Sequence, residues 1–87
     1  MSRVFVPVQL RDLSGGHAEL EIAGSTVREI VVELERRFPG IEQRLCTAGE
    51  LAPNLQVSID DQLSRRGLDA RVQPGSEIHF LPVFGGG

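Results

Sequence analysis

The sequence predicts an α+β domain in which a four- to five-stranded mixed sheet packs on one main helix. Two observations support this prediction: one strongly amphipathic helical segment follows residue 26, and several short segments alternate apolar and polar residues between glycine- and proline-containing turns. Eighty-seven residues are enough for a single core, so we expect one domain. A helix with one apolar face needs an apolar sheet face to cover it, which gives a two-layer architecture.

The N-terminal part predicts an antiparallel hairpin. Residues 3–10 carry apolar side chains at every second position, although Pro7 has no N–H to donate to a neighbouring strand. Residues 17–23 alternate in the same way. The Gly15-Gly16 pair between the two segments is a strong turn signal, so we expect two strands joined by a short loop.

The next segment predicts the main helix. Thr26 and Glu29 have the spacing of a capping box, in which each residue satisfies a free N–H at the start of a helix. Apolar residues then recur at helical spacing, and Pro39-Gly40 ends the segment. The apolar positions are Val27, Ile30, Val31, Leu34 and Phe38.

The middle of the chain gives weaker signals. Residues 41–45 could form a short second helix, and residues 46–54 have the composition of a loop. Residues 55–59 alternate apolar and polar side chains and predict a third strand, which the Asp60-Asp61 pair ends in a turn.

The last third predicts a short edge strand, a turn and a final strand. Pro74-Gly75 occupies the usual centre of a tight turn, and residues 77–83 alternate as a strand. If the first and last strands are parallel neighbours in the centre of the sheet, the arrangement is a β-grasp. We expect three apolar residues to anchor the irregular segment 62–73: Leu63, Leu68 and Val72.

Composition excludes several classes of function. Twelve acidic and nine basic residues give a formal charge of -3, which argues against a nucleic-acid-binding surface. No apolar run approaches the roughly 20 residues that span a bilayer, so we expect no membrane partner. One cysteine, Cys46, cannot form an internal disulfide, and the expected setting is the reducing cytoplasm.

Three glycines, Gly85-Gly86-Gly87, follow the final strand. Glycines at a terminus bury nothing and are expected to be flexible, so they do not serve stability. A tail without Cβ atoms can thread a narrow channel, and the six residues 82–87 reach about 20 Å when extended. We therefore expect the tail to carry its terminal carboxylate into the active site of another protein, unless the glycines are an inert tail.

These features resemble the MoaD/ThiS family of ubiquitin-like sulfur carriers. The resemblance rests on the glycine-pair hairpin, the threonine-capped helix that ends at Pro-Gly, and a final strand that leads to Gly86-Gly87. Further residue spacings look most like the longer branch of this family, which includes the cysteine-biosynthesis carrier of actinobacteria. Two features depart from the family pattern: Gly85 stands where an alanine is usual, and Ser58-Ile59-Asp60-Asp61 replaces the usual pattern of strand three. The longer-branch spacings are Val6-Pro7, Leu10-Arg11 and Gly15-Gly16, with Gly40-Ile41 and Arg44-Leu45.

The resemblance implies a function for the tail. Gly87 would be adenylated with ATP by a ubiquitin-activating-like enzyme of the MoeB/ThiF type and converted to a thiocarboxylate. The thiocarboxylate would donate sulfur to a biosynthetic enzyme for cysteine, molybdopterin or a related metabolite, and Gly85 and Gly86 would give clearance in the partner's channel. The chain would then be a carrier and not an enzyme, with no bound cofactor, a β-grasp domain at residues 1–84 and a tail at 85–87. The alternatives are a protein modifier conjugated through Gly87 and a small subunit of molybdopterin synthase.

The strand pattern also predicts a partner-binding surface. If Val4, Val6, Ile78 and Phe80 face the helix, their neighbours in the same strands face the opposite side of the sheet. An apolar patch there would suit docking of the activating enzyme, whereas scattered exposed apolar residues would need no explanation. The candidate partner-binding residues are Phe5, His79, Leu81, Val83 and Phe84.

Other chemistry-bearing residues have simpler interpretations. His17 and His79 lack a third clustered ligand, so we interpret them as surface histidines and expect no metal. Cys46 is expected to be a small buried or half-buried thiol without a catalytic role. Asp60, Asp61 and Asp69 do not have the spacing of a calcium-binding loop, and a turn explains the first two.

Overall fold

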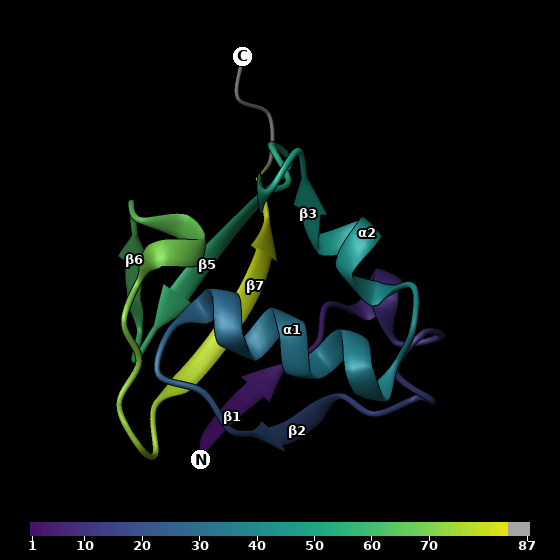
Figure 1. Cartoon of the computed structure of the whole chain (residues 1–87), viewed down its shortest axis with the longest axis horizontal. Coiled ribbons are helices and arrows are strands. Elements are labelled where there is room, and N and C mark those ends of the chain that lie inside the picture. The colour runs from purple at the N-terminus through teal and green to yellow at the C-terminus, as the bar shows by residue number, and fades with distance from the viewer. Residues whose placement is uncertain (84–87) are drawn as a thin grey trace.

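The computed structural model describes residues 1–83 and contains a five-stranded sheet that packs on one main helix (Figure 1). The sheet has the order β2-β1-β7-β5-β6, and a separate two-stranded ribbon, β3-β4, follows the second helix. The sheet strands are β1 (Ser2–Phe5), β2 (Glu19–Ile22), β5 (Leu55–Ile59), β6 (Gln62–Ser64) and β7 (Glu77–Pro82). The helices are α1 (Val27–Arg37) and α2 (Ile41–Leu45), and the ribbon is β3 (Cys46–Thr47) and β4 (Glu50–Leu51).

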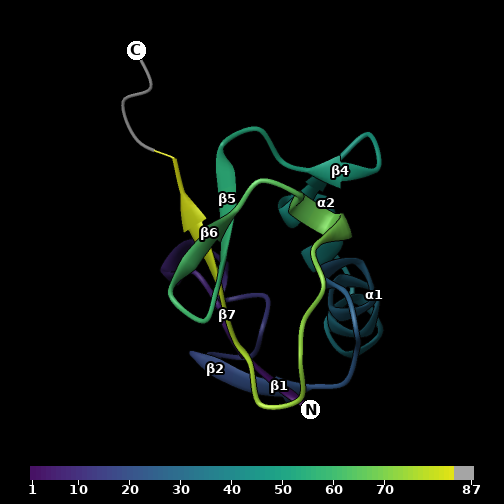
Figure 2. The same cartoon turned by 90° about the vertical axis from the view of Figure 1, so that its left-hand side faces the viewer.

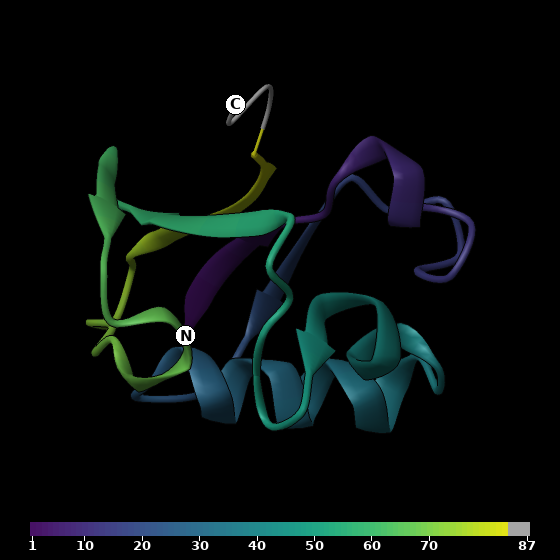
Figure 3. The ribbon, with the colours of Figure 1, turned by 90° about the horizontal axis from the view of Figure 1, so that it is seen from above.

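The two terminal strands form the centre of the sheet. β1 runs parallel to β7, with Val4 opposite Ile78, while β5 pairs with the other side of β7 in the antiparallel sense. β2 pairs antiparallel with β1, and β6 pairs antiparallel with β5. Figure 3 shows the sheet on one side and α1 on the other. The mixed sheet agrees with the prediction, and the parallel central pair meets the condition that the sequence analysis set for a β-grasp.

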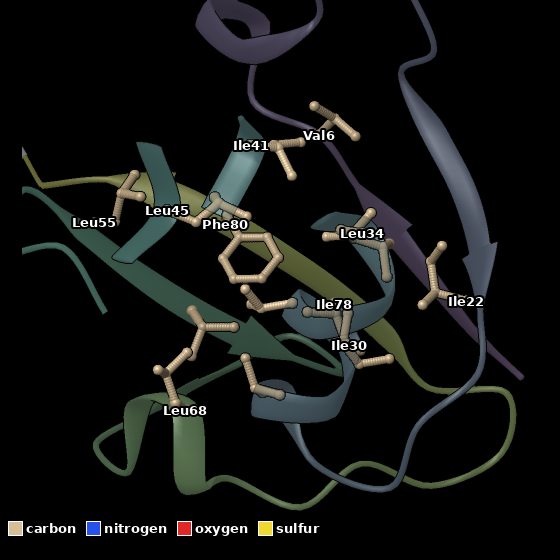
Figure 4. Packing of buried hydrophobic residues seen from close by; sticks show 14 of the residues in the cluster. Val6, Ile22, Ile30, Leu34, Ile41, Leu45, Leu55, Leu68, Ile78 and Phe80 are labelled. Carbon is tan, nitrogen blue, oxygen red and sulfur yellow. The ribbon is translucent and has the colours of Figure 1, made fainter. Parts of the chain in front are cut away.

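The core lies between the sheet and the two helices (Figure 4). Val4, Val6, Ile78 and Phe80 are buried and face α1, as predicted from the alternation in the first and last strands. Burial of such side chains supplies most of the stabilising free energy, at about 25 cal/mol per Å² of apolar surface. Their main helical partners are the fully buried residues Val27, Ile30, Val31, Leu34, Ile41 and Leu45.

The N-terminal hairpin forms, but its first strand is shorter and its loop longer than predicted. β1 ends at Phe5, and Val8–Leu10 forms a 3-10 turn instead of the end of a strand. Pro7 has no N–H to donate to a strand, and the chain leaves the sheet there. Val8 is therefore 73% exposed, whereas Leu10 is buried in the core.

The capping interactions predicted for α1 are present with one difference. The Thr26 hydroxyl accepts a hydrogen bond from the Glu29 N–H at 3.2 Å. The Glu29 carboxylate accepts hydrogen bonds from the N–H and the hydroxyl of Ser25, not from the Thr26 N–H. The hydrogen bond from the Ser25 N–H is the main reason why the pKa of Glu29 is lowered. Both residues of the predicted capping box thus hold the start of α1.

Glu35 fixes the corner between the two helices. Its carboxylate accepts hydrogen bonds from the Glu42 N–H at 2.9 Å and from the Gly40 N–H at 3.0 Å. Gly40 has a φ of 102°, a left-handed conformation that glycine adopts without a steric penalty. The N–H donors from Glu42 and Gly40 lower the pKa of the Glu35 carboxyl group.

We expect this corner to make stability dependent on pH. A carboxyl group whose pKa is lowered by folding stabilises the protein above its ordinary pKa of about 4.3, and this contribution is lost as the pH falls through the folded-state value. Glu35→Gln should therefore destabilise the protein at pH 7, and the difference from wild type should shrink in acid. Urea unfolding at pH 7 and pH 3 measures the difference in free energy of unfolding between the variant and the wild type.

The control is Glu50→Gln, at an exposed glutamate whose carboxylate makes no ion pair or hydrogen bond within residues 1–83. This variant should follow the wild type at both pH values. A Glu35→Gln difference that stays constant or grows in acid would contradict the role given to the carboxylate.

Two expectations for the middle of the chain are wrong. Residues 46–54, predicted as loop, contain the β3-β4 ribbon, in which Ala48-Gly49 forms a two-residue connection with positive φ at both positions. Leu63 was expected to help anchor the segment 62–73 but is 61% exposed, because its side chain projects from the edge strand β6 on the sheet face away from α1. Leu68 and Val72 are buried as predicted.

Other predicted elements are confirmed. The second helix covers residues 41–45, the third strand covers 55–59, and the last strand ends at Pro82. Asp60 and Asp61 form the predicted turn, with φ values of 51° and 69°. Within the described part of the chain, no helix is both long and apolar enough to cross a bilayer.

Candidate functional site

The chain approaches its C-terminal residues from the centre of the sheet. Pro82 is opposite Leu55 at the end of β7, and the Val83 N–H donates to the Asn54 carbonyl at 2.9 Å. The backbone is therefore held by the sheet up to Val83. The predicted partner-binding residue Phe84 and the predicted adenylation residues 85–87 lie outside the described residues.

The sheet face away from α1, here called the outer face, carries a row of side chains across all five strands. Strand pairing aligns Glu19, Phe5, His79, Ser58 and Leu63. Paired residues in a sheet project to the same side, so this row lies on one face. The structure thus brings together two of the predicted partner-binding residues, Phe5 and His79, and adds Leu63 to their face.

Phe5 and His79 form the middle of this row. Their rings stack in parallel, with centroids 4.1 Å apart and an interplanar angle of 3°. Both residues are partly exposed, so the stacked pair is accessible on the outer face. Two stacked rings lose little side-chain entropy on binding, which favours them as contact residues.

The outer face changes in character along β7. Next to the start of the strand, Arg3 forms ion pairs with Glu19 at 3.5 Å and with Glu77 at 3.6 Å. Towards the end of the strand, Leu81 is half-buried and Val83 is 44% exposed. The half of the face that adjoins the C-terminal residues, here called the apolar half, carries Leu81 and the Phe5–His79 pair beside Gln56 of β5, and charged residues cover the other half.

A shallow hollow continues the apolar half of the face. It has a volume of about 430 Å³ and lies between the end of β7 and the 3-10 turn after β1. Val8 and Arg11 contribute to its wall together with Phe5, His79 and Leu81. The Arg11 Nε donates to the Val6 carbonyl at 3.2 Å, which fixes the side chain beside the hollow.

Sequence reasoning missed Val8 and Arg11 as candidate contact residues. It placed Val8 inside a strand with its side chain towards the core, and the residue is instead exposed on the 3-10 turn. Pro7 was the available signal, because a proline in a strand marks an edge or an irregularity.

The remaining chemistry-bearing residues do not form a reactive site within residues 1–83. No group of three or more His, Cys, Asp or Glu side chains there could hold a metal ion. His17 is exposed, as expected for a surface histidine.

Cys46 is half-buried, as predicted, in a wall of the hollow between α1, α2 and the β3-β4 ribbon. Burial raises the pKa of its thiol, and the Glu42 carboxylate raises it further against a smaller opposing effect of Arg28. The thiol form is thus favoured over the nucleophilic thiolate.

Comparison with known proteins identifies the family. The sulfur carrier protein CysO of Mycobacterium tuberculosis is 28% identical over 89 residues, covering 97% of this chain and 96% of CysO, and its name denotes a carrier rather than an enzyme. A chain in the crystal structure of the Amycolatopsis orientalis BexX/CysO complex is 35% identical, with a TM-score of 0.91 and full coverage of both chains.

The fold extends to more distant proteins. The solution structure of the small archaeal modifier protein 1 from Methanosarcina acetivorans has a TM-score of 0.81 at 23% identity, covering 99% of this chain and 95% of that one, and shows the same fold.

A profile of the ThiS family matches residues 4–87. Since this match spans nearly the whole sequence, the predicted resemblance is confirmed, and the chain belongs to the ThiS family.

Proposed function

We propose that this protein is a sulfur carrier whose C-terminal Gly87 is adenylated and then converted to a thiocarboxylate. The observation that carries the proposal is the ThiS family match, which runs through the glycine tail to residue 87. The similarity to CysO proteins over essentially the full chain supports the same role. Residues 1–84 act as the carrier domain, and residues 85–87 act as the tail.

The chemistry of the tail needs a second protein. A carboxylate is a poor acylating group, so an adenylyltransferase of the MoeB/ThiF type joins it to the AMP part of ATP and releases pyrophosphate. A sulfide donor then attacks the acyl carbon and AMP leaves, which gives the thiocarboxylate. The carrier supplies the acyl group and a surface for docking, while the enzyme binds ATP.

The outer face is the surface that the activating enzyme contacts in this proposal. An enzyme that encloses the residues after Val83 must lie against the end of β7, where Leu81 and the Phe5–His79 pair form the apolar half of the face. Apolar and aromatic side chains at the centre of a contact usually contribute most of the binding energy. The ion-paired half around Arg3 would lie towards the rim of this contact.

The sulfur acceptor is a biosynthetic enzyme, and we propose one that makes cysteine. This proposal is supported by the similarity of the chain to proteins named CysO. The same docking face would serve the acceptor after release of the activating enzyme, because both enzymes must reach Gly87.

Intact-mass spectrometry tests the proposal. The protein is incubated with ATP, sulfide and a MoeB/ThiF-type enzyme, with a carrier that this enzyme charges as the positive control. Replacement of one oxygen by sulfur on the C-terminal peptide is expected. Covalent adducts with other proteins would instead indicate a protein modifier, and an unchanged mass beside a charged positive control would contradict the proposal.

Leu81→Asp should weaken charging by the activating enzyme. A carboxylate in the middle of the apolar half of the face loses apolar contact and adds a desolvation cost. We expect KM for the carrier to rise about tenfold or more with a smaller change in kcat, because the variant alters binding and not the reacting group. Pyrophosphate release at varied carrier concentrations measures both constants.

The matched control is Val32→Asp. Val32 is 50% exposed on α1, on the other side of the molecule from the outer face. Its replacement by aspartate introduces the same charge as Leu81→Asp. Its KM should stay close to wild type. Equal effects of the two variants would show that added charge, and not the outer face, governs recognition.

A further inference from the structure

Three arginines line a third hollow, beside the β6 edge of the sheet. The hollow has a volume of about 710 Å³ and lies between the β5-β6 hairpin and the segment that runs from Arg65 to Ser76. Arg65, Arg66 and Arg71 contribute to its wall, and all three are exposed. This edge faces the viewer in Figure 2.

The three arginines form no ion pair within residues 1–83. Four of the other six arginines do form ion pairs there, namely Arg3, Arg28, Arg36 and Arg37, whereas Arg11 and Arg44 also lack one. Three arginines without an ion-pair partner among residues 1–83 thus share one hollow, whose wall carries a single carboxylate, that of Asp60. A local field of this sign attracts an acidic partner and steers its approach.

The nearby carboxylates have other partners. The Asp60 Oδ2 accepts from the Ser76 hydroxyl at 3.0 Å, and its Oδ1 accepts from the Glu77 N–H at 2.9 Å. Asp69 forms an ion pair with Arg28 at 3.1 Å. These contacts hold the Asp60 carboxylate against the turn before β7, within the wall of the hollow, and pair Asp69, which lies outside that wall, with Arg28.

The backbone fixes the position of Arg71. The Val72 N–H donates to the Ser25 carbonyl at 3.0 Å, and the Val27 N–H donates to the Ala70 carbonyl at 3.0 Å. The segment is therefore tied to the start of α1 on both sides of Arg71. The wall of the hollow at Arg71 is therefore held by backbone hydrogen bonds.

Leu63 also lines this hollow. It is 61% exposed on β6, the edge strand of the sheet. Leu63 pairs with Ser58 of β5, and Ser58 pairs with His79 of β7. Leu63 is therefore also the last residue of the row on the outer face. An exposed leucine beside three arginines and one carboxylate combines an apolar contact with predominantly positive charge.

We infer that this hollow, defined by Arg65, Arg66, Arg71 and Leu63, is a docking site for an acidic, extended segment of a protein partner. Carboxylates of the segment pair with the guanidinium groups, and one apolar side chain packs on Leu63. Arginine suits this role because its planar group binds carboxylates in a bidentate manner. The inference goes beyond the proposed function and does not depend on it, since it requires neither Gly87 nor its activation.

A titration of the 15N-labelled full chain with an acidic peptide tests the inference. The probe is a 12-residue peptide with six glutamates and two leucines, compared with the same peptide carrying glutamine in place of glutamate. We expect the acidic peptide to shift the amide signals of residues 62–66 and 71, and the glutamine peptide to leave them unchanged. Raising NaCl from 50 to 300 mM should weaken binding several-fold, because exposed pairs are screened.

A charge-matched pair of variants provides the control. The triple variant R65Q/R66Q/R71Q should weaken binding about tenfold, since each exposed pair contributes a few-fold and the factors multiply. The triple variant R36Q/R37Q/R44Q has the same net charge and alters exposed arginines of α1 and α2, so it should bind like wild type. Circular dichroism checks that both variants are folded.

Three results would overturn the inference: equal weakening by the two triple variants, amide shifts confined to other parts of the molecule, or tighter binding of a 12-nucleotide oligothymidylate than of the acidic peptide. The first two would place any acidic binding elsewhere on the surface. The third would assign the arginines to nucleic acid. Charging of Gly87 in the same preparations is read independently, so failure of either proposal is distinguishable from failure of the other.

Discussion

Removal of Gly87 should abolish thiocarboxylate formation and leave the free energy of unfolding within about 0.5 kcal/mol of the intact chain. The truncated tail would end about 3.3 Å short of the position where the activating enzyme needs the carboxylate. A terminal glycine buries no side chain, so folding should not depend on it. Pyrophosphate release and intact mass measure charging, and urea unfolding measures stability.

The control for this truncation is Gly85→Ala, which restores the residue usual in the family at that position. It keeps the tail length and adds one methyl group, so charging should be retained. Normal charging of the truncated chain would exclude Gly87 as the reacting residue. Unfolding of the truncated chain would mean that the tail has a structural role instead.

Phe80→Ala should have the largest effect on stability, a loss of about 3–5 kcal/mol. Phe80 is 3% exposed and lies among the core side chains beside Ile78 and Leu45 (Figure 4), so its removal leaves a cavity in the centre of the domain. A domain of 87 residues is typically stable by about 4–13 kcal/mol, so the variant would lose a large share of the total. Urea or thermal unfolding measures the loss.

Phe5→Ala is the matched control, because Phe5 lies on the outer face and is only partly buried. Its truncation should cost clearly less than that of Phe80. Phe80→Leu, which keeps most of the volume, should retain a measurable folded state if Phe80→Ala does not. A larger loss for Phe5→Ala than for Phe80→Ala would contradict the assignment of the core to the helix side of the sheet.

The sequence predicted the elements whose local signals and packing agree. α1 combines a threonine cap, helical spacing of apolar residues and a Pro-Gly stop, and the final strand combines a Pro-Gly turn with alternating burial. The outward position of Phe5, His79 and Leu81 followed from alternation, once Val4 and Phe80 faced the core. Their half-buried or partly exposed state in the sheet agrees with it.

Elements with ambiguous patterns could not be predicted in this way. Val8 and Leu10 fit both a strand and a turn that continues past Pro7, and only tertiary packing of Leu10 decides between them. The β3-β4 ribbon has two-residue strands, too short for a periodic signal, and its connection places Ala48 at a φ of 55°, where alanine is uncommon. The arginine hollow depends on residues from separate segments, which only the fold brings together.

The position of β7 has a mechanical consequence. β7 has three registered pairs with parallel β1 on one side and five with antiparallel β5 on the other. A pull on the C-terminal end of this strand acts along both ladders and loads many backbone hydrogen bonds at once. A strand at the sheet's margin would instead peel away one bond at a time. The domain is thereby suited to resist mechanical unfolding when a force is applied at its C-terminal end.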